Sequence, residues 1–175
     1  AIRDGKIVGR VGAILNHKHR EKWNQPYLRF GWLDFIDDEE VSAALMGAVE
    51  GWAKERGLTA VHGPLGFTDM DREGMLIEGF DELGTMATNY NHPYYPQHMQ
   101  RLGYEKDTDW VEYELSAPDE PNEKIARAAE IVLKRNNLTL LKVKNTKELV
   151  QGYAKELFAL LEEAYSHLYG TVPMT

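Results

Sequence analysis

The sequence predicts a mixed α/β fold of the α+β class, in which a mixed sheet is flanked by helices and followed by a C-terminal strand–helix unit. Two segments rich in β-formers come first, at 6–16 and 27–36. A stripe of apolar residues with helical spacing follows them over 39–56, and a short β-rich segment lies at 58–62. Of the 175 residues, 43% are hydrophobic and 27% are charged, which is ordinary globular composition and excludes a disordered chain.

The first half of the chain shows clear local signals. An Asp4-Gly5 pair between apolar residues predicts a hairpin turn, and the polar stretch 17–25 predicts a loop. Four acidic residues at 37–40 stand where the positive end of a helix dipole favours them, so they open the helix at 39–56. The apolar stripe that should bury this helix consists of Val41, Ala44, Leu45, Ala48, Val49 and Trp52.

The second half is less regular. Residues 65–93 show no sustained period and predict a long loop, which in compact domains is usually functional or mobile. A helix at 94–102 and one or two strands within 104–115 should follow. After a linker at 116–121 we expect a helix striped by Ile125, Ala128, Ala129, Val132 and Leu133, a strand at 138–143, and a long helix preceded by the capping pair Asn145 and Glu148.

These elements predict a domain over 1–115, the linker 116–121, and a helix–strand–helix segment over 122–175. The chain enters a hairpin at once and stops without a closing element, so we expect a piece of a longer protein; a small protein with processed termini is the alternative. The apolar stripe of the last helix should pack on 1–115 or exchange between two copies as a homodimer. Alternatively, it starts a second domain and is loosely held.

Charge and composition limit the partners. Residues 1–120 hold 12 basic and 22 acidic side chains, and the whole chain carries a net charge of −8. Such a surface repels nucleic-acid backbones and anionic membranes, so neither is an expected partner. The absence of cysteine excludes disulfides and thiolate chemistry and fits a reducing, cytoplasmic location.

Candidate chemistry concentrates in residues 67–95. The segment offers carboxylates as bases, a histidine and aromatic side chains, and within it Glu78 or Asp81 is the expected base for deprotonating an amine, with Tyr95 as a further catalytic candidate. The alternative is that these polar side chains only build turns. His17 and His19 could ligate a metal, but two histidines without a third ligand favour solvated loop residues, so no metal is expected.

Four motifs resemble an uncharacterised bacterial group within the GCN5-related N-acetyltransferase (GNAT) superfamily. They are Gly63-Pro64-Leu65-Gly66-Phe67, the run from Gly74 to Asp81, the run from Tyr90 to Tyr95, and Leu102-Gly103-Tyr104-Glu105-Lys106. The resemblance covers roughly residues 3–115. It implies a GNAT-like sheet, an acyl-CoA-dependent acyl transfer to an amine of unknown identity, and a longer protein with a second similar domain after residue 121.

The chain departs from the family pattern at two positions. The family binds the pyrophosphate of acetyl-CoA or another acyl-CoA on a glycine-rich loop, but here that loop reads Asp37-Asp38-Glu39-Glu40-Val41-Ser42. Four carboxylates repel a pyrophosphate. Met99 stands where many members of the family carry a tyrosine that protonates the departing thiolate. The residues implied to line any acyl-CoA are Phe35, Ile36, Ser42 and Asn91. Two hypotheses follow: an acyltransferase with a degenerate cofactor loop, or a non-catalytic binding or assembly domain that no longer binds CoA.

Overall fold

The computed structural model describes residues 1–120 and 122–173, so Pro121, the last residue of the predicted linker, lies outside the described residues. Two compact units divide the chain: residues 1–110 together with those from 161 onward, and residues 111–160. The domain boundary expected after residue 115 stays a prediction.

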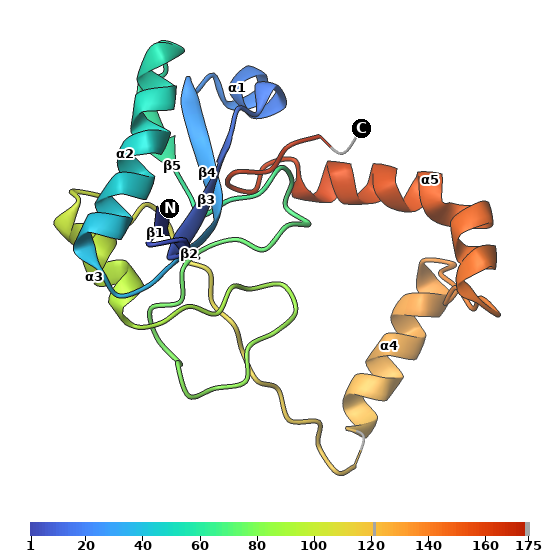
Figure 1. The fold of residues 1–175 in the computed structure, drawn as a ribbon. Helices are drawn as coiled ribbons and strands as arrows, with labels where there is room; N and C mark the ends of the chain where they lie inside the picture. The colour runs from blue at the N-terminus through green and yellow to red at the C-terminus, as the bar shows by residue number, and fades with distance from the viewer. Residues whose placement is uncertain (121, 174–175) are drawn as a thin grey trace. The chain divides into compact units, whose positions relative to one another are not determined.

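The first unit is built on a three-stranded sheet of order β3-β4-β5, comprising β3 (Gly9–Ile14), β4 (Tyr27–Phe35) and β5 (Ala60–His62), as Figure 1 shows. Strand β4 lies in the centre, antiparallel to β3 and parallel to β5. A parallel neighbour needs a crossover, which α2 (Glu39–Glu55) provides. The predicted mixed α/β class is therefore confirmed.

A small hairpin precedes this sheet. Strands β1 (Ile2–Arg3) and β2 (Lys6–Ile7) pair across the Asp4-Gly5 turn, where both residues have positive φ. Glycine adopts a positive φ without a steric penalty. The observed pairing confirms the turn predicted from the Asp-Gly pair.

Helix α2 packs on the sheet through Leu45 and Val49, which are buried, and Trp52, which is partly buried. The buried stripe is rotated from the predicted one, because Ala44 and Ala48 are exposed whereas Met46 and Ala53 are buried. Alanines can lie on either face, so they did not define the stripe. The core around this helix comprises Leu28, Phe30, Phe35, Val41, Leu45, Met46, Val49, Ala53, Leu58, Tyr95 and Met99.

The segment predicted as a polar loop at 17–25 instead contains a helix, α1 (His17–Trp23). Its start is fixed by Asn16, whose side chain accepts a hydrogen bond from the backbone N–H of His19 at 3.0 Å. Such caps stabilise a helix even without an apolar stripe. The prediction of a loop was therefore wrong, because it considered the missing apolar periodicity of this segment and not the N-cap residue Asn16.

The loop 63–93 leads into α3 (Tyr94–Arg101), as predicted. Its first residues run beside β4, where a Cβ on Gly31 would collide with the Leu65 carbonyl, so only glycine permits this approach. The strands expected within 104–115 are wrong: in the described residues this stretch has no regular structure, and its β-formers have no partner strand.

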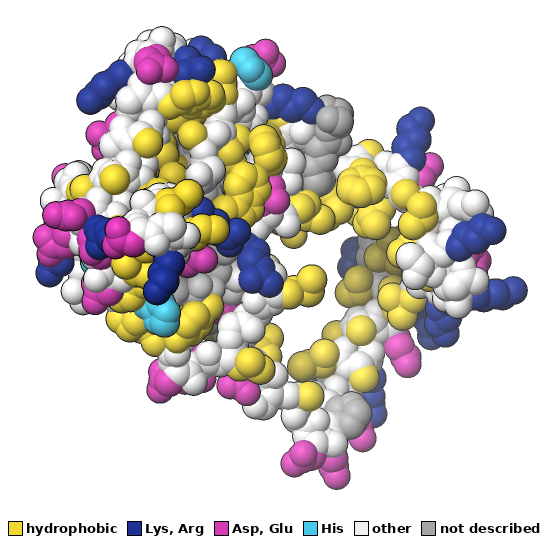
Figure 2. Space-filling view, in the orientation of Figure 1, with side chains coloured by type: hydrophobic (Ala, Val, Ile, Leu, Met, Phe, Trp, Pro, Cys, Tyr) yellow, Lys and Arg dark blue, Asp and Glu magenta, His cyan; other side chains and the backbone are white. Residues whose placement is uncertain are grey.

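The second unit contains α4 (Glu123–Arg135) and most of α5 (Thr146–Tyr165), both predicted. The Asn145 side chain accepts the N–H of Glu148 at 3.0 Å, which confirms half of the expected capping pair. The strand expected at 138–143 is absent from the described residues. Apolar side chains of this unit are exposed (Figure 2), among them Ile125, Ile131, Val150, Phe158 and Leu160.

Replacing Leu45 by Ala should lower the free energy of unfolding by about 2–5 kcal/mol, because a buried leucine leaves a cavity in a packed core. Urea denaturation followed by tryptophan fluorescence measures this change. Leu83, which is 97% exposed, is the matched control, and its replacement by Ala should change stability by no more than about 0.5 kcal/mol. Equal effects at the two positions would contradict the packing described.

Candidate functional site

The face of β4 that points away from α2 carries a buried arginine. Successive residues of a strand point to opposite faces, so Leu28 and Phe30 enter the core while Arg29 lies on the other side. Arg29 is 0% exposed. Its Nη1 donates to the Gly66 carbonyl at 3.1 Å, and its Nη2 donates to the Gly170 carbonyl and to His19 Nδ1. The Arg29 Nε is buried without a partner.

Two histidines lie next to this guanidinium. His19 Nδ1 accepts from Arg29 at 3.0 Å, so its proton is on Nε2, which donates to Gln25 Oε1 at 3.1 Å. Burial and the Arg29 charge lower the pKa of His19 to about 4. His62 pairs with Arg29 across the β4–β5 ladder, and its ring centroid is 4.8 Å from that of His19.

Both ring nitrogens of His62 are buried and have no hydrogen-bond partner. Burial is the main cause that lowers the pKa of His62 to about 3, with His19 and Arg29 adding to it. Both imidazoles are therefore neutral at pH 7. A neutral ring with unpartnered nitrogens can donate or accept a hydrogen bond from a ligand.

Two carboxylates from the loop after Gly66 complete the cluster. Burial first, then the neighbouring Asp69 charge, raise the pKa of Glu73 to about 7, although Arg29 opposes the shift. Burial also raises the pKa of Asp69. One oxygen of each, Glu73 Oε1 and Asp69 Oδ1, is buried without a partner. Asp71 orders this loop by accepting the N–H groups of Phe67 and Thr68 at 2.8 and 3.0 Å.

A strap formed by residues 169–173 lies against the cluster. Gly170, Thr171 and Val172 are buried. The Gly170 carbonyl accepts from Arg29. The Thr171 carbonyl accepts from Trp23 Nε1 at 2.9 Å, and the Thr171 hydroxyl accepts from Lys22 at 2.7 Å. These side-chain contacts hold a segment distant in sequence over Arg29 and Asp69.

This cluster can perform acid–base chemistry. A carboxyl group with a pKa near 7 is poised to accept a proton at neutral pH and to return it. Buried polar atoms are normally hydrogen-bonded, and unpartnered ones require an explanation. Glu73, His62 and Asp69 together place several such atoms at one site, and strongly shifted pKa values are a recognised mark of functional sites.

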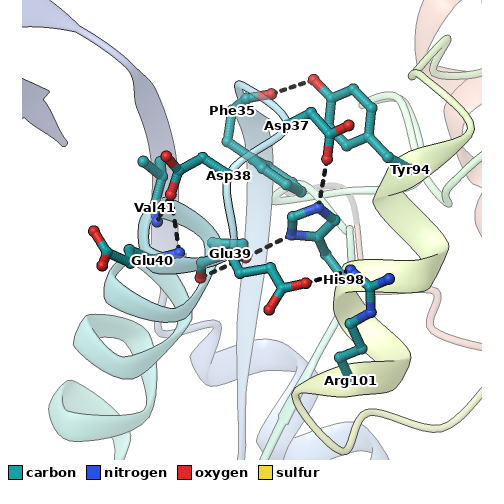
Figure 3. A network of polar contacts seen from close by, with 10 residues as sticks. Phe35, Asp37, Asp38, Glu39, Glu40, Val41, Tyr94, His98 and Arg101 are labelled. Atoms are coloured by element: carbon teal, nitrogen blue, oxygen red, sulfur yellow. Dashed lines mark hydrogen bonds and ion pairs between the residues drawn. The ribbon is translucent and has the colours of Figure 1, made fainter.

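A second polar network lies at the start of α2 (Figure 3). The Asp38 carboxylate accepts the N–H groups of Glu40 and Val41 at 3.0 and 3.2 Å. Outside this view, Arg3 donates to Asp38 at 2.7 Å. The hydrogen bond from Arg3 is the largest cause that lowers the pKa of Asp38, followed by the backbone hydrogen bond from Val41; the Arg3 charge and the Glu40 N–H add to it. The helix N-terminus is therefore occupied by the chain's own carboxylate.

The same network ties α3 to α2. His98 is buried, with Nε2 at 2.9 Å from Asp37 Oδ1 and Nδ1 at 2.8 Å from the Ser42 hydroxyl. Arg101 donates to Glu39 at 2.6 Å. The Ser42 hydroxyl is itself buried. Because each partner comes from a helix end, the arrangement fastens two helices rather than exposing a nucleophile.

The predicted site residues fall into separate places. Tyr95 and Phe35 stack at 4.3 Å, and the Tyr95 hydroxyl donates to Asp34 and accepts the Phe35 N–H. Burial is the main cause that raises the pKa of Tyr95. Of the other expected acyl-CoA contacts, Ser42 lies in the His98 network, Ile36 is exposed, and Asn91 bonds the backbone of Leu76 in both directions.

Glu78 and Asp81 are both exposed on the loop. Neither belongs to the Arg29 cluster or to the contacts of Tyr95 with Phe35 and Asp34. Their role as bases stays a prediction, whereas Glu73, five residues before Glu78, has the environment that a base requires.

His17 is exposed, as expected of a solvated histidine, but His19 is buried, so the expectation that it is solvated was wrong. Sequence reasoning did not select Arg29 or His62. A charged residue between Leu28 and Phe30 in the strand predicted at 27–36 was the available signal for Arg29. No group of three or more His, Asp or Glu side chains in 1–120 and 122–173 is arranged to hold a metal ion.

Two curated proteins are similar to this chain. It is 31% identical over 176 residues to "Protein YghO" of Escherichia coli K12, which covers the whole chain and 44% of that protein. It is 28% identical over 114 residues to "Bacterial ceramide synthase" of Caulobacter vibrioides, covering 65% of the chain and 30% of that protein. The chain thus spans less than half the length of either relative. No family model and no solved structure matches it.

Among the described residues, none of the helices combines the length and apolar character needed to pass through a bilayer.

The raised pKa of Glu73 should make stability depend on pH. A carboxyl with a pKa of 4.5 in the unfolded chain and about 7 in the fold binds more protons when folded, so its ionisation destabilises the fold as pH rises from about 4.5 to 7. The Glu73→Gln variant lacks this titration. Urea unfolding at pH 5, 6, 7 and 8 should show the variant gaining on the wild type by up to about 3 kcal/mol.

The control is Glu78→Gln, which removes the same charge from an exposed position in the same loop. Its stability should follow the wild type across this range. Parallel pH profiles for the wild type and Glu73→Gln would contradict the burial assigned to Glu73.

Proposed function

We propose that this chain carries part of an acyl-transfer site that forms an amide from an activated acyl group and an amine. The GNAT-like motifs support this class of reaction. The relative named as a ceramide synthase also supports it, because a ceramide is the amide of a fatty acid with a long-chain amino alcohol. The GNAT fold and the identity of the substrate are part of the proposal.

Glu73 is the residue we assign as the base. In the reaction the amine nitrogen attacks the acyl carbonyl carbon, the bond from that carbon to the leaving sulfur or oxygen breaks, and the nitrogen loses a proton. Glu73 accepts this proton and returns it to the leaving group. A pKa of about 7 allows both transfers near neutral pH. The proposal rests mainly on the placement of the Glu73 carboxyl in the cluster around Arg29, where its Oε1 is buried without a hydrogen-bond partner.

The surroundings of Glu73 suit this role. Arg29 limits the rise of the Glu73 pKa, so a useful fraction of the carboxylate is ionised at pH 7. His19 and His62 remain neutral at this pH. The cluster therefore combines one base with neutral polar groups in a largely water-excluded place.

Acyl-CoA does not fit the position where the family resemblance puts its pyrophosphate. The two N–H groups at the start of α2 already bond to Asp38, and three further carboxylates surround them. The favoured acyl donor is therefore one whose carrier is not held at this helix. This occupied N-terminus also favours the second candidate function, a non-catalytic binding or assembly domain without CoA.

Acetyl-CoA should bind this chain with a dissociation constant weaker than about 10 μM, or about −7 kcal/mol. Isothermal titration calorimetry measures it directly. Replacing Asp37 and Asp38 together by Asn should tighten any residual binding by removing repulsion. A dissociation constant below about 10 μM for the wild type would refute the occupied-terminus argument.

Amide formation should be detected by mass spectrometry when the chain is incubated with a long-chain amino alcohol and an acyl N-acetylcysteamine thioester, which has no pyrophosphate. Glu73→Gln should slow turnover by about 10²–10⁴-fold, the usual contribution of a general base. The exposed Glu78→Gln is the matched control and should retain turnover. The proposal fails if the wild type forms no amide, or if Glu78→Gln and not Glu73→Gln abolishes it.

The cytoplasmic location and the homodimer expected from the sequence remain proposals alongside this function.

A further inference from the structure

The stretch 131–147, which we call the basic segment, differs in charge from the rest of the chain. It carries five cations and no Asp or Glu, whereas the whole chain has a net charge of −8. It lies within the second unit, and Figure 2 shows basic and apolar side chains next to each other around the turn between α4 and α5. The exposed residues of the segment are the cations Lys134, Arg135, Lys142, Lys144 and Lys147 and the large apolar residues Ile131, Val132, Leu138, Leu140 and Leu141.

The fold accounts for only two of these cations. Lys134 and Arg135 end α4, where the negative end of the helix dipole favours a positive charge. Lys142 and Lys144 lie in a stretch without regular structure, and Lys147 stands in the first turn of α5, where the dipole disfavours a cation. The ion pairs within 1–120 and 122–173 all involve other cations. The five charges are therefore available to an anionic partner.

The exposed apolar side chains narrow the class of this partner. Leu140 is 74% exposed and Ile131 is 63% exposed, so a partner that fits the segment offers an apolar phase as well as negative charge. A nucleic acid offers the charge, but proteins hold its bases by stacking aromatic side chains on them, and the segment contains no aromatic residue. The surface of an anionic bilayer offers both, because its head groups attract cations and its interfacial layer accepts apolar side chains.

We propose that the basic segment binds the surface of a bilayer that contains anionic lipids, with its cations at the head groups and its exposed apolar side chains in the interfacial layer. The expectation that this chain avoids anionic membranes rests on the acidic excess of residues 1–120 and on the net charge. A bilayer responds instead to the charges within about 10 Å of its surface at about 0.1 M salt. The basic segment can therefore bind although the chain as a whole is acidic.

This inference goes beyond the proposed function and does not depend on it. Long apolar chains partition into membranes, so the contact would bring the chain to the place where a long-chain amine is concentrated. A chain that does not bind vesicles can still form an amide from dissolved substrates. The two proposals therefore fail separately.

Co-sedimentation of the 175-residue chain with lipid vesicles tests the proposal. The vesicles contain either phosphatidylcholine alone or phosphatidylcholine mixed with about one third phosphatidylserine, which is anionic. We expect the chain to sediment with the mixed vesicles and not with phosphatidylcholine alone. Raising the salt from about 0.1 M to about 1 M should release most of the bound chain, because the Debye length falls from about 10 Å to about 3 Å.

Replacing Lys142 and Lys144 together by Gln should weaken the partition onto mixed vesicles by about 25-fold, because each cation near an anionic surface contributes roughly fivefold. The matched control replaces Lys6 and Lys54 by Gln. It changes the net charge equally, at exposed lysines of the first unit. The control should bind mixed vesicles as the wild type does.

Leu140→Ser tests the apolar part of the contact and should weaken the partition by about tenfold, since a side chain that enters the interfacial layer is lost. Leu83→Ser is its control, because Leu83 is 97% exposed in the first unit. Both leucines are exposed, so neither replacement should disturb the fold.

The proposal is overturned if the wild type does not sediment with mixed vesicles, if its binding is undiminished at about 1 M salt, or if each pair of variants has equal effects. Light scattering and binding of a labelled RNA oligonucleotide then identify what covers the segment instead. A dimer that Leu140→Ser dissociates, without vesicle binding, would assign the segment to a second copy of the chain. Binding of RNA without vesicle binding would assign it to nucleic acid.

Discussion

The burial of Arg29 is the interaction on which the rest of the site depends. An arginine stays charged in a protein, and burying its charge is costly unless hydrogen bonds compensate it. The Nη1 and Nη2 atoms of Arg29 have acceptors, whereas its Nε has none. The alternation of strand β4 places this side chain on the face opposite the core. There it donates hydrogen bonds to the Gly66 carbonyl, the Gly170 carbonyl and His19. Three segments that are far apart in sequence therefore meet at one side chain. Removing it would leave each of these partners without its donor.

The same charge adds to the larger effect of burial on the pKa of His19 and His62, and opposes it at Glu73. Together with burial it keeps His19 and His62 neutral, and it restrains the pKa of Glu73 near 7 where burial and Asp69 would otherwise take it higher. Glu73 is thus a group of this cluster whose pKa lies near neutral pH. At the start of α2 the opposite holds, since carboxylates there are paired with cations and backbone N–H groups and leave no place for an anion.

The sequence predicted correctly those elements whose signals lie within a few neighbouring residues. Strand β4, helix α2 and the Asp4-Gly5 hairpin follow from periodicity, dipole charges and turn chemistry. Helix α1 was missed because its residues are polar and its only signal was the Asn16 cap. The strand predicted at 138–143 was wrong because β-propensity needs a partner strand. The Arg29 cluster was not selected from the sequence for a different reason: its members lie up to 141 residues apart, and no spacing links Arg29 to Gly170.

Glu73, Glu78 and Asp81 share one polar loop, and the sequence does not show which of them is buried. Only the fold distinguishes Glu73 from the two exposed carboxylates. The most direct measurement of this distinction is a ¹³C titration of the glutamate carboxyl groups, with Glu73 assigned by its absence in Glu73→Gln. The Glu73 resonance should titrate with a pKa of about 7. A midpoint at the ordinary glutamate value of 4.5 would contradict the assignment of Glu73 as the buried base of this site.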